Sequence, residues 1–184
     1  MTILKDLSIK WKEENLILPI WYEDGRVNII DQIKLPFNEE VYSLDSVSQL
    51  ARAIKDMTIR GSGAIGIAGA YGILLSAVES NGDIERIKEG GLLLKSTRPT
   101  AVNLMKTVDE MIQYVVSYSG DDIISYIEHM VAEVVTRQLD YEKKLGEYGA
   151  KLIQDGDTIL THCHSGALAG AGFGGRALSV IRTA

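Results

Sequence analysis

The chain has 184 residues and a net charge of −6, a length that allows one domain or two small ones. Hydrophobic residues make up 46% and charged residues 24%, as in ordinary globular proteins, and the acidic balance argues against a nucleic-acid partner, which would require a basic patch. The single cysteine, Cys163, excludes an internal disulfide bond and suits the reducing conditions of the cytoplasm, where we expect the protein to be.

The start of the chain is aromatic and rich in residues that favour strands. Residues 16–22 and 26–30 are predicted strands, and the Glu-Asp-Gly turn signal at residues 23–25 predicts that they form a hairpin. Pro36 is expected to end the extended piece that follows. We therefore expect a small β piece before the first helix.

A helical layer is predicted next, beginning with a helix that Asp45 or Ser46 caps and that runs toward Met57. Residues 64–78 are apolar all round, and this run is shorter than the roughly 20 residues of a membrane span, so we interpret it as a buried helix. Glycine recurs there at every third residue although it costs about 1 kcal/mol per helix position, which close packing against neighbouring helices would explain. The glycines are Gly63, Gly66, Gly69 and Gly72.

Three more helices are predicted before residue 150. One spans residues 83–96, and the next has Pro99 in its first turn and runs to about residue 118. Asp121 or Asp122 caps a long amphipathic helix that continues through residue 149. The apolar side of this helix carries Ile124, Ile127, Val131, Val134, Val135 and Leu139.

The segment from Asp157 to Gly166 is the most informative part of the chain, because it places Cys163 between a predicted strand and a predicted helix start. Ile159 and Leu160 are predicted strand, and Gly166 opens the predicted first turn of a helix. Unpaired N–H groups and the helix dipole at such a turn favour an anion. We therefore expect Cys163 to be a reactive thiolate and a phosphate to bind at the same place.

One strand followed by one helix cannot form a sheet, because a parallel strand needs neighbours. We therefore expect the chain to be part of a larger protein whose remaining strands follow Ala184. Roughly the last 30 residues are expected to be the least stable part, since their sheet neighbours are missing.

Two arginines lie beside predicted helix starts. Arg60 could hold a phosphate with two hydrogen bonds while the N–H groups of Gly61 and Ser62 donate to it, or this segment could be a tight turn with a surface arginine. Arg98 could act in the same way, although a capped helix start with a solvated arginine is the alternative that the pattern alone favours. The two arginines become significant if the fold brings them together.

Cys163 could be a nucleophile, an acid or base, or a buried small residue. The adjacent His162 and His164 could tune a thiolate or bind a metal, but no other cysteine or well-placed carboxylate completes a ligand set, so no metal is expected. His129 is expected to be structural. Residues 170–175 match G-x-G-x-x-G, but the match lies about nine residues beyond the predicted strand, inside the helix pattern, so nucleotide binding is not expected.

At three motifs the chain resembles methylthioribose-1-phosphate isomerases and, more broadly, their relatives among the translation initiation factor 2B subunits and the ribose-1,5-bisphosphate isomerases. The matching strings are residues 59–66 (IRGSGAIG), 98–104 (RPTAVNL) and 160–169 (LTHCHSGALA), and residues 177–182 (ALSVIR) also look like the family. They keep the order and approximate spacing of the family. The string at residues 98–104 is the one that most favours the isomerase.

The resemblance implies an isomerase of methionine salvage that converts 5-methylthioribose 1-phosphate to 5-methylthioribulose 1-phosphate, without a metal or nucleotide cofactor. It implies that Arg60, Gly61 and Ser62 hold the substrate, that Arg98 pairs with its phosphate, and that Cys163 is the catalytic cysteine. The expected partner is thus a small sugar phosphate, with no nucleic acid and no membrane. A homodimer is the usual assembly of the family.

The resemblance also implies the fold class, which is α/β. A mainly helical domain with short strands, here residues 1–152, precedes a Rossmann-like domain, of which residues 153–184 would be the first β-α unit. The catalytic aspartate of the family and its later substrate-binding residues would lie beyond Ala184. The chain is therefore expected to be inactive, or nearly so, by itself.

Two departures from the family pattern concern the site. The family usually has Ala-Pro where this chain has Ser62-Gly63, and Asn-Ala where it has His164-Ser165. The expected chemistry needs an acid to open the sugar ring and a base to move hydrogen between C1 and C2, and the aspartate would complement Cys163 in this task. Two alternatives stay open: a ribose-1,5-bisphosphate isomerase, and a non-catalytic regulatory subunit like those of initiation factor 2B.

Overall fold

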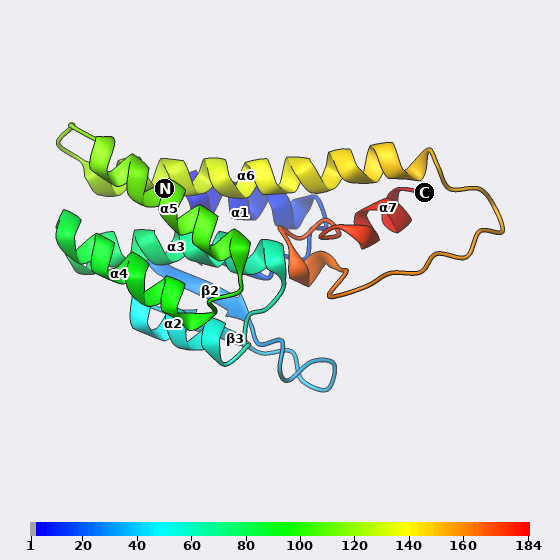
Figure 1. Cartoon of the computed structure of the whole chain (residues 1–184), viewed down its shortest axis with the longest axis horizontal. Helices are drawn as coiled ribbons and strands as arrows, with labels where there is room; N and C mark the ends of the chain where they lie inside the picture. The colour runs from blue at the N-terminus through cyan, green and yellow to red at the C-terminus, as the bar shows by residue number, and fades with distance from the viewer. Residues whose placement is uncertain (1–2) are drawn as a thin grey trace.

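The computed structural model describes residues 3–184, which form a mixed α/β fold, as predicted. The elements in chain order are α1 (Ile3–Glu13), β1 (Ile20–Glu23), β2 (Arg26–Ile30), β3 (Val41–Leu44), α2 (Val47–Lys55), α3 (Ser62–Glu79), α4 (Ile84–Thr97), α5 (Val102–Ser117), α6 (Ile123–Ala150), the short 3-10 helix η1 (Ala167–Ala169) and α7 (Ala177–Thr183). The long helix α6 runs along one side of the molecule, α3 lies in the middle, and the sheet with α2 lies on the opposite side (Figure 1).

Helix α3 forms the centre of the core because its sequence is apolar on every side. All residues from Gly63 to Ala77 are buried, and the helix packs against α2, α4, α5 and α6. It is long and apolar enough to cross a membrane, but 83% of it is buried inside the protein. We therefore interpret it as a core helix. A Cβ at Gly72 would lie 2.5 Å from Leu94, which confirms that the glycines permit close packing.

The three strands form one antiparallel sheet in the order β1-β2-β3. Asp24 and Gly25 both have positive φ at the turn between β1 and β2, so the predicted hairpin is confirmed, although β1 begins at Ile20 and is shorter than expected. The extended piece predicted to end at Pro36 is instead a series of turns after β2. The strand that follows, β3, escaped prediction because only Leu44 of its four residues is buried.

The N-terminal helix α1 also escaped prediction. Its buried residues Leu4, Ser8 and Trp11 recur at helical spacing, and the helix packs against β1 and α6. The β-branched residues Ile3 and Ile9 are exposed, so the strand-favouring composition of the start of the chain does not decide its structure here. The helical spacing of the buried residues and their packing against β1 and α6 do.

Most of the helix starts occur where the sequence predicts them. Ser46 caps α2, Asp83 caps α4 and Asp122 caps α6, each by accepting a hydrogen bond from a backbone N–H in the first turn. The start of α5 differs from the prediction, since Pro99 lies in a turn before the helix, where the N–H of Ala101 donates to the Arg98 carbonyl.

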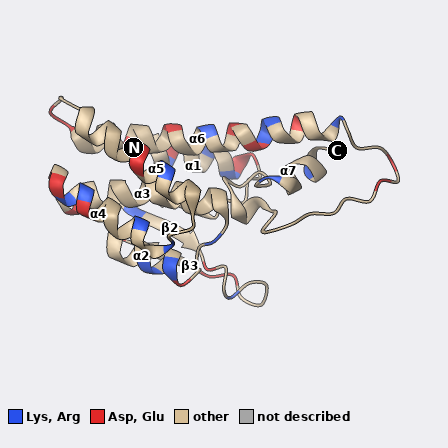
Figure 2. Ribbon diagram, in the orientation of Figure 1, with Lys and Arg blue, Asp and Glu red and all other residues tan. Residues whose placement is uncertain are grey.

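The amphipathic pattern predicted for α6 is confirmed. Its apolar side faces the core, and acidic and basic residues are interspersed on the rest of its surface (Figure 2). Arg137 pairs with Glu110 of α5 at 2.8 Å, and Lys143 pairs with Glu14 at 3.1 Å. These pairs fasten α6 to both neighbouring segments.

After α6 the chain leaves the body of the molecule in an extended loop and then returns (Figure 1). The strand predicted at Ile159 and Leu160 is wrong: these side chains are 39% and 96% exposed, and residues 158–162 have no regular structure. A strand cannot form there because residues 3–184 offer no neighbouring strand to pair with it. The α-helix predicted from Gly166 is replaced by η1, and α7 begins only at Ala177.

Candidate functional site

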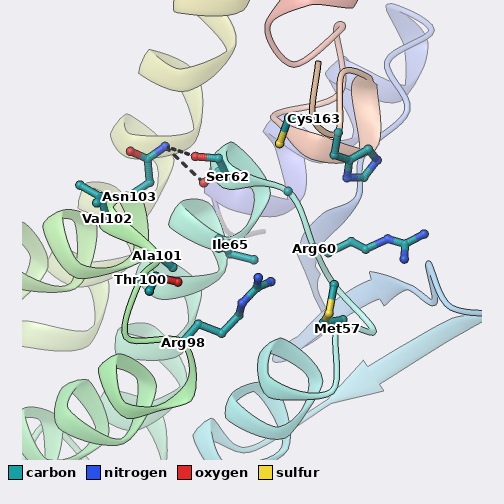
Figure 3. Close-up of a pocket in the computed structure, with 12 residues that line it drawn as sticks. Met57, Arg60, Ser62, Ile65, Arg98, Thr100, Ala101, Val102, Asn103 and Cys163 are labelled. Carbon is teal, nitrogen blue, oxygen red and sulfur yellow. Dashed lines mark hydrogen bonds between the residues drawn. The ribbon is translucent and has the colours of Figure 1, made fainter. Parts of the chain in front are cut away.

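Three segments that are far apart in the sequence meet around one cavity of about 650 Å³ (Figure 3). They are the turn before α3, the loop between α4 and α5, and the stretch around Cys163. All five residues predicted to bind substrate or to act on it lie on the wall of this cavity. The lining residues are Met57, Arg60, Gly61, Ser62, Ile65, Arg98, Thr100, Ala101, Val102, Asn103, Cys163 and His164.

The turn before α3 presents a helix start that no side chain caps. Gly61 is the N-cap residue, has φ 104, and accepts a hydrogen bond from the N–H of Ile65 at 2.9 Å. A Cβ at this position would clash with the backbone of Ala169, so both the dihedral angle and the space require glycine. The free N–H groups of the first turn and the positive end of the helix dipole suit an anion.

Arg60 is held by Gln32, a buried residue that the sequence did not single out. The Nη2 of Arg60 donates to the Gln32 carbonyl oxygen at 3.1 Å, and the Nε2 of Gln32 donates to the carbonyls of Arg60 at 3.3 Å and Leu168 at 3.1 Å. The guanidinium of Arg60 therefore points away from Arg98 in this structure (Figure 3). Gln32 thus joins the turn before α3 to the C-terminal stretch.

Arg98 ends α4, and its side chain projects into the cavity (Figure 3). Beside it, Asn103 in the first turn of α5 donates through Nδ2 to the Ser62 hydroxyl at 2.8 Å and to the Ser62 carbonyl at 3.3 Å. This bond ties the start of α5 to the start of α3. Asn103 belongs to the RPTAVNL string, so the motif could have indicated it, but its partner lies 41 residues away and only the fold shows it.

Cys163 is exposed and lies on a loop, not at a helix start, which corrects the predicted setting. Its φ of 70 lies in the left-handed region, and the hydroxyl of Ser165 donates to the carbonyl of His162 at 3.0 Å. The helix that was expected to activate the thiol does not form at this position, and the next regular element is η1 at Ala167. The cavity wall nevertheless includes Cys163 together with both arginines.

His164 lies on the same wall as Cys163. Partial burial and the positive charge of Arg60 lower the pKa of His164 below its ordinary value of 6.5. The shift favours the neutral form of the imidazole, which can accept a proton. Within residues 3–184, no group of three or more His, Cys, Asp and Glu side chains is placed to hold a metal ion.

The glycine-rich stretch at residues 170–175 is a loop that closes around a buried carboxylate. Glu142 of α6 is 1% exposed and accepts hydrogen bonds from four backbone N–H groups of this loop and from Gln138. Such a nest of N–H groups binds anions, and here the anion is a side chain of the protein, which leaves no free cradle for a pyrophosphate. The four donors are Ala171 at 2.6 Å, Phe173 and Gly174 at 3.3 Å and Gly175 at 3.0 Å.

The charge around the cavity favours an anionic ligand. Arg60, Arg98 and two helix starts border the cavity, and none of its twelve lining residues is Asp or Glu. A phosphate held by these groups would lie on the same wall as the only thiol of the chain. The arrangement can therefore bind a phosphorylated small molecule next to a thiol and an imidazole, the kinds of side chain that can exchange protons.

Comparison with known proteins places the chain in a family. The model of the Initiation factor 2 subunit family matches residues 58–184. The methylthioribose-1-phosphate isomerase of Thermosipho africanus is 38% identical over 98% of this chain and 51% of its own length. A putative methylthioribose-1-phosphate isomerase of Methanocaldococcus jannaschii is 43% identical over 90% of this chain and 47% of its own length. The chain thus spans about half the length of the curated relatives it matches.

Two solved structures have the same fold over 91% of this chain and 50% of their own chains. The 5-methylthioribose 1-phosphate isomerase from Pyrococcus horikoshii superposes with a TM-score of 0.81 at 31% identity. The translation initiation factor eIF-2B, subunit delta, from A. fulgidus superposes with a TM-score of 0.79 at 37% identity. The similarity therefore includes both enzymes and initiation-factor subunits.

Proposed function

Because the chain belongs to the Initiation factor 2 subunit family, we propose that it is the N-terminal part of an isomerase that converts 5-methylthioribose 1-phosphate to 5-methylthioribulose 1-phosphate in methionine salvage. The observation that supports this most directly is the cavity that holds Arg60, Arg98 and Cys163 together. Residues 1–152 would be the mainly helical domain and residues 153–184 the start of a Rossmann-like domain. A cytoplasmic homodimer is the expected form of the complete enzyme.

The phosphate of the substrate would lie between the start of α3 and Arg98. The N–H groups of Gly61 and Ser62 would donate to its oxygens, and the guanidinium of Arg98 would pair with its charge. Arg60 would join these donors once its side chain leaves the Gln32 carbonyl. Fixing the phosphate in this way places C1 and C2 of the sugar at a constant distance from Cys163.

The reaction requires one group that gives a proton to the ring oxygen and one that moves hydrogen between C1 and C2. Cys163 would be one of these groups, and an aspartate beyond Ala184 would be its partner. We therefore propose that the 184-residue chain binds the sugar phosphate but turns it over slowly or not at all. Comparison of this chain with the full-length gene product in a turnover assay tests the proposal, and equal rates would contradict the need for residues beyond Ala184.

Binding can be tested on the 184-residue chain itself. Arg98→Met removes the charge that would pair with the phosphate, so we expect the affinity for 5-methylthioribose 1-phosphate to fall roughly 10- to 150-fold, since hydrogen bonds to charged groups are worth about 1.5–3 kcal/mol. Arg86→Met is the matched control, because Arg86 is an exposed residue of the same helix, α4, outside the cavity. Calorimetry measures both, and equal affinities of the two variants would contradict the phosphate site.

A regulatory subunit is the second candidate, favoured by the likeness to the eIF-2B delta subunit. Such a subunit would bind a phosphorylated ligand as a signal without acting on it. Cys163→Ser distinguishes the two functions, because it should abolish turnover by the full-length isomerase but leave a purely regulatory function intact. Ligand affinity measured on the same variant separates loss of chemistry from loss of binding.

A further inference from the structure

The hydrogen bond between Asn103 and the Ser62 hydroxyl can run in only one direction. The Nδ2 of Asn103 lies 2.8 Å from the hydroxyl oxygen of Ser62 and 3.3 Å from the carbonyl oxygen of the same residue. A carbonyl oxygen can only accept, so the amide atom that faces both oxygens is the NH₂ group, which can only donate. The hydroxyl of Ser62 therefore accepts from Asn103 and keeps its own hydrogen for another partner.

That hydrogen has no acceptor among residues 3–184, where the bond from Asn103 is the one bond that the Ser62 hydroxyl makes. Ser62 is exposed and lines the candidate cavity together with Asn103 and Arg98 (Figure 3). The cavity wall carries no carboxylate that could take the hydrogen. An anion in the cavity would therefore find a hydroxyl that is free to donate to it, in addition to the backbone N–H groups of the helix start.

Core packing holds Asn103 in the position from which it donates. A Cβ at Gly66 would lie 3.4 Å from the Cβ of Asn103, and a Cβ at Gly69 would lie 3.0 Å from Leu104, so the first turn of α5 rests closely on α3. Leu104, the neighbour of Asn103, is fully buried. The amide of Asn103 is thus presented to Ser62 from a fixed backbone.

We propose that the hydroxyl of Ser62 is a phosphate ligand in this cavity and that Asn103 is its positioning residue. The proposal rests on the proposed sugar-phosphate site, which uses only the backbone N–H of Ser62. The family that the chain resembles usually has alanine at this position, and alanine has no hydroxyl. The extra donor is therefore a feature of this chain, and it should strengthen binding of the phosphate without taking part in the proton transfers.

The hydroxyl can be tested by calorimetry with inorganic phosphate and with 5-methylthioribose 1-phosphate. We expect Ser62→Ala to weaken the binding of both ligands roughly 10-fold, because a hydrogen bond to a charged group is lost. Ser62→Thr keeps the hydroxyl and should restore most of the affinity. Ser125→Ala is the matched control, because Ser125 is an exposed serine in the first turn of α6, outside the cavity.

The positioning role of Asn103 can be tested with a double-mutant cycle. Asn103→Ala leaves the Ser62 hydroxyl free to turn away, so we expect phosphate affinity to fall roughly 2- to 10-fold. In the Ser62→Ala background the same change should have no further effect, because the group that Asn103 orients is gone. Losses that add in the double variant would show that Asn103 acts on the anion independently, and an unchanged affinity of the single variant would also overturn its positioning role.

Turnover by the full-length gene product gives a second readout. The phosphate does not react, so we expect Ser62→Ala to raise KM for 5-methylthioribose 1-phosphate roughly 10-fold while kcat changes little. A variant whose helix start is merely distorted would lose kcat as well, because the sugar would no longer be held at a constant distance from Cys163. A fall in kcat with an unchanged KM therefore contradicts the proposal.

The outcomes distinguish this proposal from the proposed function. If the parent chain binds neither ligand, the phosphate site itself is refuted, and the role of Ser62 with it. If Arg98→Met weakens binding and Ser62→Ala does not, the role of Ser62 is refuted alone. If Ser62→Ala weakens binding of the sugar phosphate but not of inorganic phosphate, the hydroxyl contacts the sugar and its assignment to the phosphate is overturned.

Discussion

The chain up to Ala150 and the stretch after it are held together by different interactions. The first region contains nearly all of the apolar core, and Ala171 is the one fully buried member of the core cluster that comes from the second region, among residues 3–184. The second region is fixed instead by close glycine contacts and by hydrogen bonds to Gln32 and Glu142. It has little regular structure apart from η1 and α7.

The two regions also contribute different groups to the candidate site. The arginines and the two helix starts that would bind phosphate belong to the region that contains the apolar core. Cys163, which would transfer a proton, and His164 belong to the second region and are both exposed. Core packing therefore positions the groups that would bind phosphate, whereas a few polar and glycine contacts position Cys163 and His164.

The largest effect should come from removing a core side chain of the first region. Leu104 is fully buried between α3 and α5, so Leu104→Ala should lower the free energy of unfolding by about 2–5 kcal/mol. Leu160→Ala makes the same change in the second region, where the side chain is 96% exposed, and should cost less than about 0.5 kcal/mol. Urea denaturation measures both, and equal losses would show that the two regions do not differ in packing.

Removing the buried charge that organises the glycine-rich loop should come next. Glu142→Gln keeps the shape of the side chain but places an NH₂ group among N–H donors, so we expect a loss of about 2–3 kcal/mol. Glu147→Gln is the matched control, because Glu147 is exposed on the same helix. Amide exchange should show faster opening of residues 171–175 only in Glu142→Gln, and uniform opening of the whole chain would contradict a local role.

A glycine at the boundary between the regions gives a smaller effect. Gly61 and Gly25 both have positive φ, but a Cβ at Gly61 would meet Ala169 and a Cβ at Gly25 would meet nothing within 4 Å. Gly25→Ala should cost about 1 kcal/mol for the dihedral angle alone, and Gly61→Ala about 1 kcal/mol more because Ala169 must move. Thermal unfolding measures the difference, which should vanish if the second region does not pack against α3.

The smallest effect concerns the charge of His164. Its pKa is lower in the folded protein than the ordinary value of 6.5, so the unfolded chain binds more protons near that pH. The stability that the neutral imidazole contributes is therefore present above pH 6.5 and is lost as the pH falls below it. His164→Asn should become more stable relative to the parent between pH 7 and about 5. Melting temperatures across this range measure the trend, and a constant difference would contradict it.

Local signals in the sequence were sufficient for much of the fold and for the candidate residues. The caps of α2, α4 and α6 and the apolar pattern of α3 depend on residues within a few positions of each other, so they could be predicted without knowing what packs against them. Arg60, Arg98 and Cys163 were found in the same way, from short motifs. The family could be recognised because these motifs occur in order along the chain.

The strand at Ile159 and Leu160, by contrast, was predicted from residue preference and does not form, because a strand requires a partner that residues 3–184 do not provide. The helix α1 was missed because its pairing with α6 joins residues more than a hundred positions apart. Only the tertiary structure brought Cys163 to the same cavity as the arginines, and only it showed that Gln32 holds Leu168 and that Glu142 holds the glycine-rich stretch. Such contacts join segments that are far apart in the sequence, so no local sequence pattern predicts them. Helix caps and helical periodicity, by contrast, involve residues within one or two turns of each other.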